Sequence, residues 1–423
     1  MLKCFTPYVD LSISVHEDAL KINPCCKIYP KSAALDSDLI NNEFISKIRK
    51  DLHKKENNSD CDYCWKAEKN NLISWRQLEG QVPDKWKNVN LLEHERGTLF
   101  QFLKLTFDNV CDSACVYCNS NNSNTWIKEI SKNLDQTKLL DKNVPYRGWN
   151  GREPNEDLTK SANTVKNLLR YLGSKIPLYE DYFNIAFLGG EPFLSPHLTD
   201  GKFIEYINAF YEHAPKDFSL IYEFNTNCNT PKKLINKQIK LIEESRLKYK
   251  NAKPKIVISG EAYGPALEYV RYGTKWKRYK ENVELYFSNP IFQINLNMAI
   301  NVFSIPNLFE YFTFMFHNAS TYNKKLRVTA GCVNRPDALH PNVLPERFSK
   351  YIDITINLIN DNQHLFFDDT HYSAIKNVLT NLHQEIGSAT DLTPQLKNYV
   401  KYFKIVRNMD IANYVPELHF LND

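Results

Sequence analysis

Residues 102–118 decide the fold, and they read FLKLTFDNVCDSACVYC. The first six of these residues predict a short strand. The loop that follows carries Cys111, Cys115 and Cys118 with the spacing CxxxCxxC. Three thiolates on one loop can hold three irons of a 4Fe–4S cluster and leave the fourth iron open to a small molecule. A structural zinc site takes four ligands, and because this loop lacks histidine, zinc would need a remote cysteine.

Strands and helices alternate on the carboxyl side of this loop, which predicts parallel βαβ units in an α/β barrel or partial barrel. The expected strands are 184–188, 219–224, 255–259 and 293–302, and the expected helices are 124–134, 162–172, 203–213, 231–244, 275–287 and 305–317. Residues 137–158 are polar and predict a loop or lid. Three helices at 348–360, 371–385 and 394–407 are expected to form the carboxyl-terminal part.

The first 90 residues predict a small, irregular module with a strand at 9–15 and a helix at 42–55. Half of the chain's ten cysteines lie in this module: Cys4, Cys25, Cys26, Cys61 and Cys64. Since so short and polar a segment has little core of its own, a bound metal centre could supply its stability. A cluster and a structural zinc site both remain open for these cysteines.

The composition of the 423 residues is that of a globular protein, with 43% hydrophobic and 24% charged residues. The length predicts two or three domains. No apolar run reaches about 18 residues, so no membrane span is expected. The net charge is +4 and basic runs such as 231–233 are short, which predicts a solvated face rather than a nucleic-acid site. We expect a cytoplasmic protein because the first residues lack the pattern of a signal peptide.

Four further motifs each lie at or near the end of a predicted strand or in the following segment. They are Gly189-Gly190-Glu191-Pro192, Asn225-Thr226-Asn227, Ser259-Gly260-Glu261 and the segment 268–273 around Arg271. Parallel α/β folds place their active sites at the carboxyl ends of the strands. The order of these motifs behind the cysteine loop therefore predicts one shared site.

In this order the motifs resemble the radical S-adenosylmethionine superfamily. The resemblance implies a partial (β/α)6 barrel in which Cys111, Cys115 and Cys118 hold a 4Fe–4S cluster. It also implies that S-adenosylmethionine chelates the open iron, and that an electron from the cluster cleaves it to a 5′-deoxyadenosyl radical. The radical would then abstract hydrogen from a substrate carbon. A reducing electron donor such as flavodoxin or ferredoxin would be a partner, and neither nucleic acid nor a membrane is expected.

The resemblance also implies contacts to S-adenosylmethionine. Tyr117 occupies the position of the family's aromatic residue beside the adenine, and Arg271 that of an arginine that pairs with a carboxylate. Glu261 stands where the family's ribose-binding segment usually has aspartate. The full implied set is Tyr117, Gly189, Gly190, Glu191, Pro192, Thr226, Asn227, Ser259, Glu261 and Arg271. No residue is assigned as catalytic.

The amino-terminal cysteines resemble a twitch module, a shortened relative of the auxiliary-cluster SPASM domain. By this resemblance Cys4, one of Cys25 and Cys26, Cys61 and Cys64 would hold a second 4Fe–4S cluster. Residues 17–19 depart from the pattern, because many such modules carry a glycine in that hairpin. We predict Cys228 and Cys332 to be buried thiols rather than ligands.

These expectations define three domains: an auxiliary-cluster module at 1–95, a radical S-adenosylmethionine barrel at 96–320 and a mainly helical extension at 321–423. Family resemblance makes a peptide the leading substrate, with a small metabolite as the alternative. From a different class, the chain could be a non-catalytic iron–sulfur or zinc-stabilised binding protein.

Overall fold

The computed structural model describes residues 4–15, 20–25, 27–33, 38–39, 41–54, 56–69, 74–78, 101–140, 158–175, 182–199 and 201–422. Cys26 lies outside these ranges, and so does the predicted boundary between the first two domains. Most of the loop predicted at 137–158 also lies outside them.

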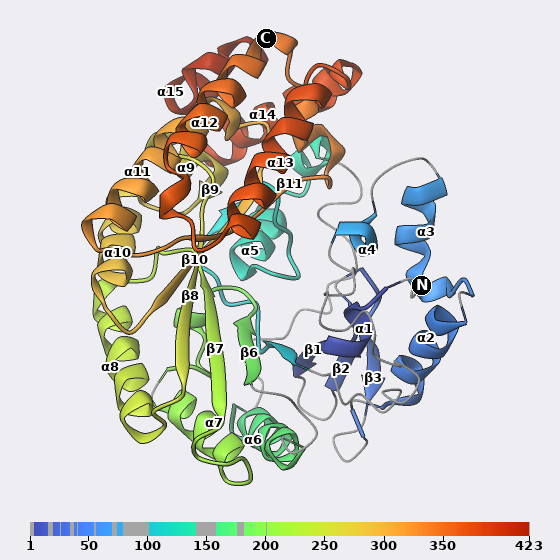
Figure 1. Cartoon of the computed structure of the whole chain (residues 1–423). Coiled ribbons are helices and arrows are strands. Elements are labelled where there is room, and N and C mark those ends of the chain that lie inside the picture. Colours follow the sequence, from blue (N-terminus) through green and yellow to red (C-terminus); the bar gives the residue numbers. More distant parts are fainter. Residues whose placement is uncertain are drawn as a thin grey trace.

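One nine-stranded sheet organises the described chain, in the order β11-β10-β8-β7-β6-β4-β1-β2-β3 (Figure 1). Every neighbouring pair from β11 to β1 is parallel, and β2 and β3 complete an antiparallel edge. The strands are β1 (Asp10–Val15), β2 (Leu20–Asn23), β3 (Lys31–Ala33), β4 (Phe102–Thr106), β6 (Tyr182–Leu188), β7 (Ser219–Thr226), β8 (Lys253–Ser259), β10 (Gln293–Ile300) and β11 (Arg327–Cys332). A separate two-stranded ribbon pairs β5 (Ala114–Cys115) with β9 (Arg271–Tyr272).

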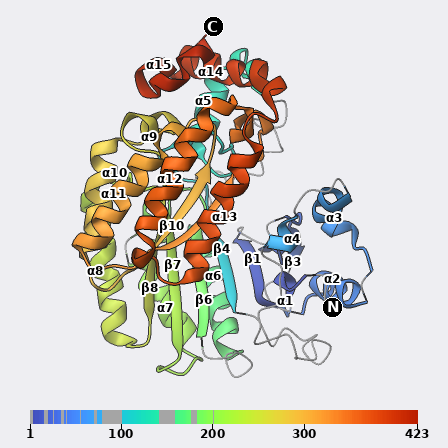
Figure 2. The same ribbon diagram turned by 45° about the horizontal axis from the view of Figure 1, so that its top comes forward.

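Helices connect the parallel strands and pack along the sheet (Figures 1 and 2). Those within the repeating units are α5 (Asn124–Lys132), α6 (Leu158–Ser174), α7 (Lys202–Tyr211), α8 (Lys232–Lys248), α9 (Pro265–Val270), α10 (Trp276–Ser288) and α11 (Leu308–Thr321). The others are α1 (Thr6–Val9), α2 (Glu43–His53), α3 (Asp62–Lys69), α4 (Trp75–Leu78), α12 (Ser349–Asp361), α13 (Asp369–Glu385), α14 (Thr393–Arg407) and α15 (Ile411–Tyr414).

The two faces of the sheet differ because side chains alternate along each strand. On β4, Leu103 and Leu105 are completely buried, whereas Lys104 between them is only half-buried. The register places Lys104, Glu223 and Lys255 on one face, where Lys104 pairs with Asp10 and Lys255 Nζ lies 2.8 Å from Glu223 Oε2. The sheet thus has an apolar face for its core and a polar face.

Aromatic rings dominate the apolar core. The Phe187 and Phe224 ring centroids lie 5.2 Å apart on neighbouring strands, and Phe203 from α7 packs on both rings. The amino-terminal module adds a small second core of Cys4, Cys25, Ile28, Ile48 and Leu52. Its strand β1 continues the main sheet beside β4.

The α/β class predicted from the sequence is confirmed, and every strand and helix placed by the pattern between residues 162 and 317 is present. The short strands β2 and β3, the two-stranded ribbon and β11 were not predicted. β11 follows the predicted domain boundary at residue 320, yet it pairs with β10 in the main sheet. Within the described ranges no helix is both long and apolar enough to cross a membrane.

Two leucine substitutions, one in the core and one at the surface, test which face of β4 is buried. Leu103→Ala removes a completely buried side chain from β4 and should lower the free energy of unfolding by about 2–5 kcal/mol, because a cavity remains. Leu247→Ala, at a side chain that is 82% exposed on α8, should change it by less than about 0.5 kcal/mol. Urea unfolding measures both, and equal losses would contradict this orientation of β4.

Candidate active site and thiol-rich cavity

The three cysteines of the CxxxCxxC loop lie just beyond the carboxyl end of β4. Cys115 is buried in β5, and Cys111 and Cys118 are half-buried on either side of it. The Cys118 N–H donates to the Cys115 carbonyl at 2.9 Å, which closes a tight turn. The structure therefore brings the three predicted ligands together on one short segment.

The other predicted motifs lie at the same edge of the sheet, as expected. Gly189 follows the last residue of β6, Thr226 ends β7 and Ser259 ends β8. Because these strands are parallel to β4, their carboxyl ends share one edge with the cysteine loop. Arg271 reaches the site differently, through the β5–β9 ribbon, in which Cys115 is paired with Arg271.

The paired glycines allow two backbones to touch. A Cβ atom on Gly190 would lie 2.2 Å from the Val110 carbonyl oxygen, and one on Gly189 would lie 2.4 Å from that of Asp108. Gly189 also has a φ of +128°, which disfavours other residues. The Glu191 N–H donates to the Val110 carbonyl at 2.7 Å. These contacts fix the start of the cysteine loop against the end of β6.

Glu191 joins the ends of two strands. Its buried carboxylate accepts hydrogen bonds from the Phe193 N–H at 3.1 Å, the Thr226 hydroxyl at 3.2 Å and the Asn227 N–H at 2.6 Å. Burial raises the pKa of the Glu191 carboxyl to about 8, although the Asn227 N–H favours the charged form. Pro192 is also buried and begins the short 3-10 helix Pro192–Leu194.

Asn227 connects the end of β7 to the cysteine loop. Its Nδ2 donates to Asp112 Oδ1 at 2.7 Å and to Ser113 Oγ at 3.2 Å, and it lies 3.8 Å from Cys111 Sγ. Asn229 Nδ2 donates to the second oxygen of Asp112 at 2.7 Å. The sequence did not single out Asp112 or Asn229, because neither belongs to a spaced motif.

A buried ion pair lies beside Cys115, whereas Asn227 lies beside Cys111. Arg271 donates Nε and Nη2 to the two oxygens of Glu261, at 3.0 and 2.7 Å, and the Tyr117 hydroxyl lies 3.2 Å from the same carboxylate. The Arg271 and Glu261 side chains are 6% and 0% exposed. Arg271 Nη1 lies 3.9 Å from Cys115 Sγ. In this structure the arginine fork is thus directed at Glu261 and the cysteine loop.

The three thiols fit a metal–sulfur cluster by their chemistry. Burial raises the pKa of Cys111, Cys115 and Cys118, and charge on Cys115 raises those of Cys111 and Cys118 further. A thiol binds metal only as thiolate, so metal binding would release the protons of these thiols, and the positive charge of the metal would offset the cost of burying the thiolates. The Asn227 amide and the Arg271 guanidinium beside the sulfurs are the kind of donors that tune clusters.

A second group of thiols lines a cavity in the amino-terminal module. Cys4, Cys25, Cys61 and Cys64 all face this space, which has a volume of about 20 Å³. Burial raises the pKa of Cys61 to about 12, and charges on Cys4 and Cys64 add to the shift. Four of the five predicted amino-terminal ligands therefore surround one cavity, and the fifth, Cys26, lies outside the described residues.

Arg76 is a feature of this cavity that the sequence did not reveal. It lines the cavity beside the four thiols, pairs with Glu68 and stacks on Trp65, with its guanidinium carbon 4.3 Å from the ring centroid. Tyr63, between Cys61 and Cys64, lies against the segment after β11, where Asn334 Nδ2 is 3.4 Å from its hydroxyl. The amino-terminal segment therefore contacts the segment that follows β11.

Across the described ranges, no three or more His, Cys, Asp and Glu side chains are arranged to hold a single metal ion. A 4Fe–4S cluster needs a wider spacing of its ligands than a single ion does, because each thiolate binds a different iron.

The remaining predicted cysteines differ in burial. Cys228 is completely buried next to Asn227, as predicted. Cys332 was also predicted to be buried, but it is only half-buried, because it ends the edge strand β11. Partial burial still raises the pKa of its thiol to about 12.

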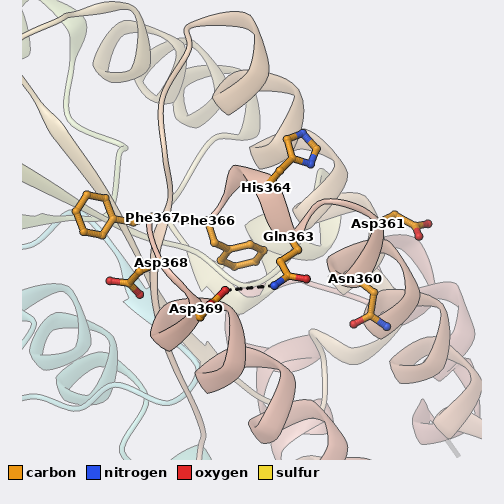
Figure 3. A pocket seen from close by; sticks show the side chains of 8 residues that line it. All are labelled: Asn360, Asp361, Gln363, His364, Phe366, Phe367, Asp368 and Asp369. Carbon is orange, nitrogen blue, oxygen red and sulfur yellow. Dashed lines mark hydrogen bonds between the residues drawn. The ribbon is translucent and has the colours of Figure 1, made fainter.

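A larger hollow of about 680 Å³ lies away from these residues, between the end of α12 and the start of α13 (Figure 3). Gln363 Nε2 donates to Asp369 Oδ1 at 3.3 Å across its floor. Its lining includes none of the predicted site residues. The neighbouring segment pairs with Leu326, just before β11, so the hollow lies at the amino end of that strand.

No protein-family model and no curated protein matches this sequence. Among solved structures, native anSMEcpe with bound AdoMet is 12% identical, with a TM-score of 0.39 over 62% of this chain and 61% of that chain. The complex of native anSMEcpe with AdoMet and the Cp18Cys peptide is 14% identical, with a TM-score of 0.36 over 62% and 60%. Streptococcus suis SuiB bound to S-adenosylmethionine is 14% identical, with a TM-score of 0.32 over 82% and 69%.

The chain thus spans about three fifths of the length of the first of these structures. Similarity at this level does not carry a functional assignment, which has to rest on the residues of the site.

Gly190→Ala tests the backbone contact at this site. The added methyl group would displace residues 108–110, and we expect a loss of about 1–3 kcal/mol in unfolding free energy. Gly331→Ala is the matched control, because a Cβ atom at that position would have no neighbouring atom within 4 Å. Urea unfolding measures both effects. A Gly190→Ala protein as stable as the control would contradict the contact.

Proposed function

We propose that this protein is a radical S-adenosylmethionine enzyme. The observation that carries the proposal is the position of Cys111, Cys115 and Cys118, three thiols on one loop at the carboxyl edge of a parallel sheet. Three protein ligands leave one iron of a 4Fe–4S cluster open. A closed structural zinc site would instead need a fourth ligand.

The cluster, when bound, would supply the electron that cleaves S-adenosylmethionine to a 5′-deoxyadenosyl radical. The residues of the chain would hold the loop and orient the cofactor. Asn227 holds Asp112 and Ser113 at one end of the loop, and Arg271 lies beside Cys115 at the other. These bonds would keep the three sulfurs in fixed positions while an electron is added.

S-adenosylmethionine would lie along the ends of β6, β7 and β8. Its proposed contacts are Tyr117, Gly189, Gly190, Glu191, Pro192, Thr226, Asn227, Ser259, Glu261 and Arg271. Glu191 and Glu261 are both buried near this edge, where their carboxyl oxygens can accept hydrogen bonds from the cofactor. Since Glu261 is bonded to both Tyr117 and Arg271, it would also set the orientation of those two side chains.

The parallel strands β4, β6, β7, β8, β10 and β11 would form the partial (β/α)6 barrel of this enzyme class, with β1 beside β4. Cys4, Cys25, Cys61 and Cys64 would hold a second 4Fe–4S cluster in a twitch-like module. The convergence of these four thiols on one space supports this assignment, and that space, whose volume of about 20 Å³ suffices for one water, would widen when the cluster binds. This cluster would take up an electron from the substrate radical or pass one to the active site.

The substrate would be a peptide, from which the radical abstracts hydrogen at a carbon. The polar face of the sheet supports a hydrogen-bonding substrate, because Lys104, Glu223 and Asn297 are not fully buried there. A cytoplasmic electron donor such as flavodoxin or ferredoxin would reduce the clusters.

Cleavage of S-adenosylmethionine tests the proposal. The reconstituted protein, reduced under anaerobic conditions, should form 5′-deoxyadenosine and methionine. Replacing Cys111, Cys115 and Cys118 together by alanine should abolish this product, because the cluster would lose all three of its protein ligands. Liquid chromatography with mass spectrometry measures it.

Cys332→Ala is the matched control, since this thiol belongs to neither proposed cluster, and it should retain cleavage. Cleavage that survives in the triple variant would refute the proposed role of the loop. No cleavage by the reconstituted wild-type chain would favour a non-catalytic iron–sulfur or zinc-stabilised binding protein.

Metal analysis tests the amino-terminal site separately. The triple variant should keep about four irons and four sulfides per chain in the second cluster, and adding Cys61→Ala and Cys64→Ala should remove them. Zinc in place of iron and sulfide in the triple variant would contradict the second cluster and identify a structural zinc site.

A further inference from the structure

The carboxyl-terminal helix α14 contributes a buried arginine next to the cysteine loop. Arg407, the last residue of α14, has a side chain with 0% exposure. Its Nε lies 3.2 and 3.0 Å from the two oxygens of Glu129 on α5, and the Tyr402 hydroxyl donates to the same carboxylate at 3.1 Å. Removing an ion pair from water costs free energy, so a buried pair is weak evidence for added stability. The pair of Arg407 and Glu129 is therefore a candidate for a role other than stability.

Arg407 contacts both elements that hold Cys115. Its guanidinium carbon lies 4.6 Å from the ring centroid of Trp126 and 4.6 Å from that of Tyr272. The Trp126 indole N–H donates to the Cys115 carbonyl at 2.9 Å. Tyr272 belongs to β9, whose pairing with β5 fixes Ala114 and Cys115. The arginine therefore supports the strand of the middle cysteine from two sides.

The guanidinium also has an unused donor. Arg407 Nη1 is buried and has no hydrogen-bond partner among the described residues. Arg407 is thus a fixed, buried cation that reaches Cys115 through Trp126 and through the β5–β9 pairing of Tyr272, and buried charges around a cluster are among the factors that set its reduction potential.

We propose that Arg407 is a positioning residue of the cluster site: it holds Cys115 through Trp126 and Tyr272, and with Glu129 it sets the local charge that the cluster meets. The proposal rests on the proposed cluster at Cys111, Cys115 and Cys118. It gives the carboxyl-terminal helices a function in the chemistry, since α14 would complete the cluster site from outside the barrel.

Two substitutions that change the local charge in opposite directions distinguish an electrostatic role of Arg407 from a role in packing alone. Arg407→Met leaves Glu129 as an uncompensated negative charge and should make the midpoint potential of the first cluster more negative, because reduction adds negative charge. Glu129→Gln leaves the arginine unpaired and should shift the potential in the positive direction. Arg407→Lys keeps the charge and should stay near the wild-type potential. The measurement is a redox titration of the full-length protein, following the signal that is absent from the triple cysteine variant.

Hydrogen exchange of the cluster-free protein tests the positioning role independently. In Arg407→Met, the segment 111–118 should exchange roughly tenfold faster or more, because the support of Trp126 and Tyr272 is weakened. Arg347→Met is the matched control, because Arg347 also stacks on rings of the carboxyl-terminal part, those of Phe348 and Phe420, but is exposed. It should change neither the exchange nor the potential.

Potentials that shift in the same direction in Arg407→Met and Glu129→Gln, or not at all, would overturn the electrostatic role. Exchange of 111–118 that is equal in Arg407→Met and wild type would overturn the positioning role. A wild-type chain that binds no iron at the loop contradicts the proposed function instead, and this is seen before any variant is compared. If Arg407→Met does not fold, Glu129→Gln and Arg407→Lys still decide the sign of the charge effect.

Discussion

The contact between the backbones of Gly190 and Val110 is the constraint on which the rest of the site depends. Parallel pairing of β4 and β6 brings the two loops to the same edge of the sheet. Only glycine then allows them to touch, because a Cβ atom would overlap the Val110 carbonyl. From this fixed point the cysteine loop runs across the ends of β7 and β8, and each of those strands supplies a polar group that meets it. Asn227 binds Asp112, and Glu261 meets Tyr117 and Arg271.

Hydrogen bonding and one ion pair explain why so many polar side chains can be buried here. Glu191, Glu261 and Arg271 are each at most 6% exposed, and each has hydrogen-bond partners from another element of the site. Buried polar groups with satisfied bonds fix one arrangement of the chain, whereas unsatisfied ones would destabilise it. Burial raises the pKa of Cys111, Cys115 and Cys118, so these thiols are neutral without a metal and add no charge to the site.

Much of this architecture could be predicted from sequence, because its signals are local. The strand at 102–106, its cysteine loop and the glycine pair after β6 each occupy a few consecutive residues. The strands β2 and β3 were missed because they are only four and three residues long, and β11 carries a glycine that weakens its pattern. Helix α9 and the two-residue strand β9 gave too few residues for a periodic signal.

The partners of the site residues could not be predicted, because they depend on tertiary contacts. Arg271 was expected to bind a carboxylate of the ligand, but nothing local indicated that Glu261, ten residues earlier, would meet it. The pair of Glu129 and Arg407 joins residues 278 positions apart. Likewise, the spacing of Cys4, Cys25, Cys61 and Cys64 indicated metal ligation by analogy, whereas their common cavity is a property of the folded module.

If the loop of Cys111, Cys115 and Cys118 leaves one iron with a free coordination position, S-adenosylmethionine should bind that iron. Electron paramagnetic resonance of the reduced protein, with and without S-adenosylmethionine, measures this binding. The signal absent from the triple cysteine variant should change its g values when S-adenosylmethionine is added, since the ligands of one iron change. A signal that is unchanged by saturating S-adenosylmethionine would contradict an open iron at this loop.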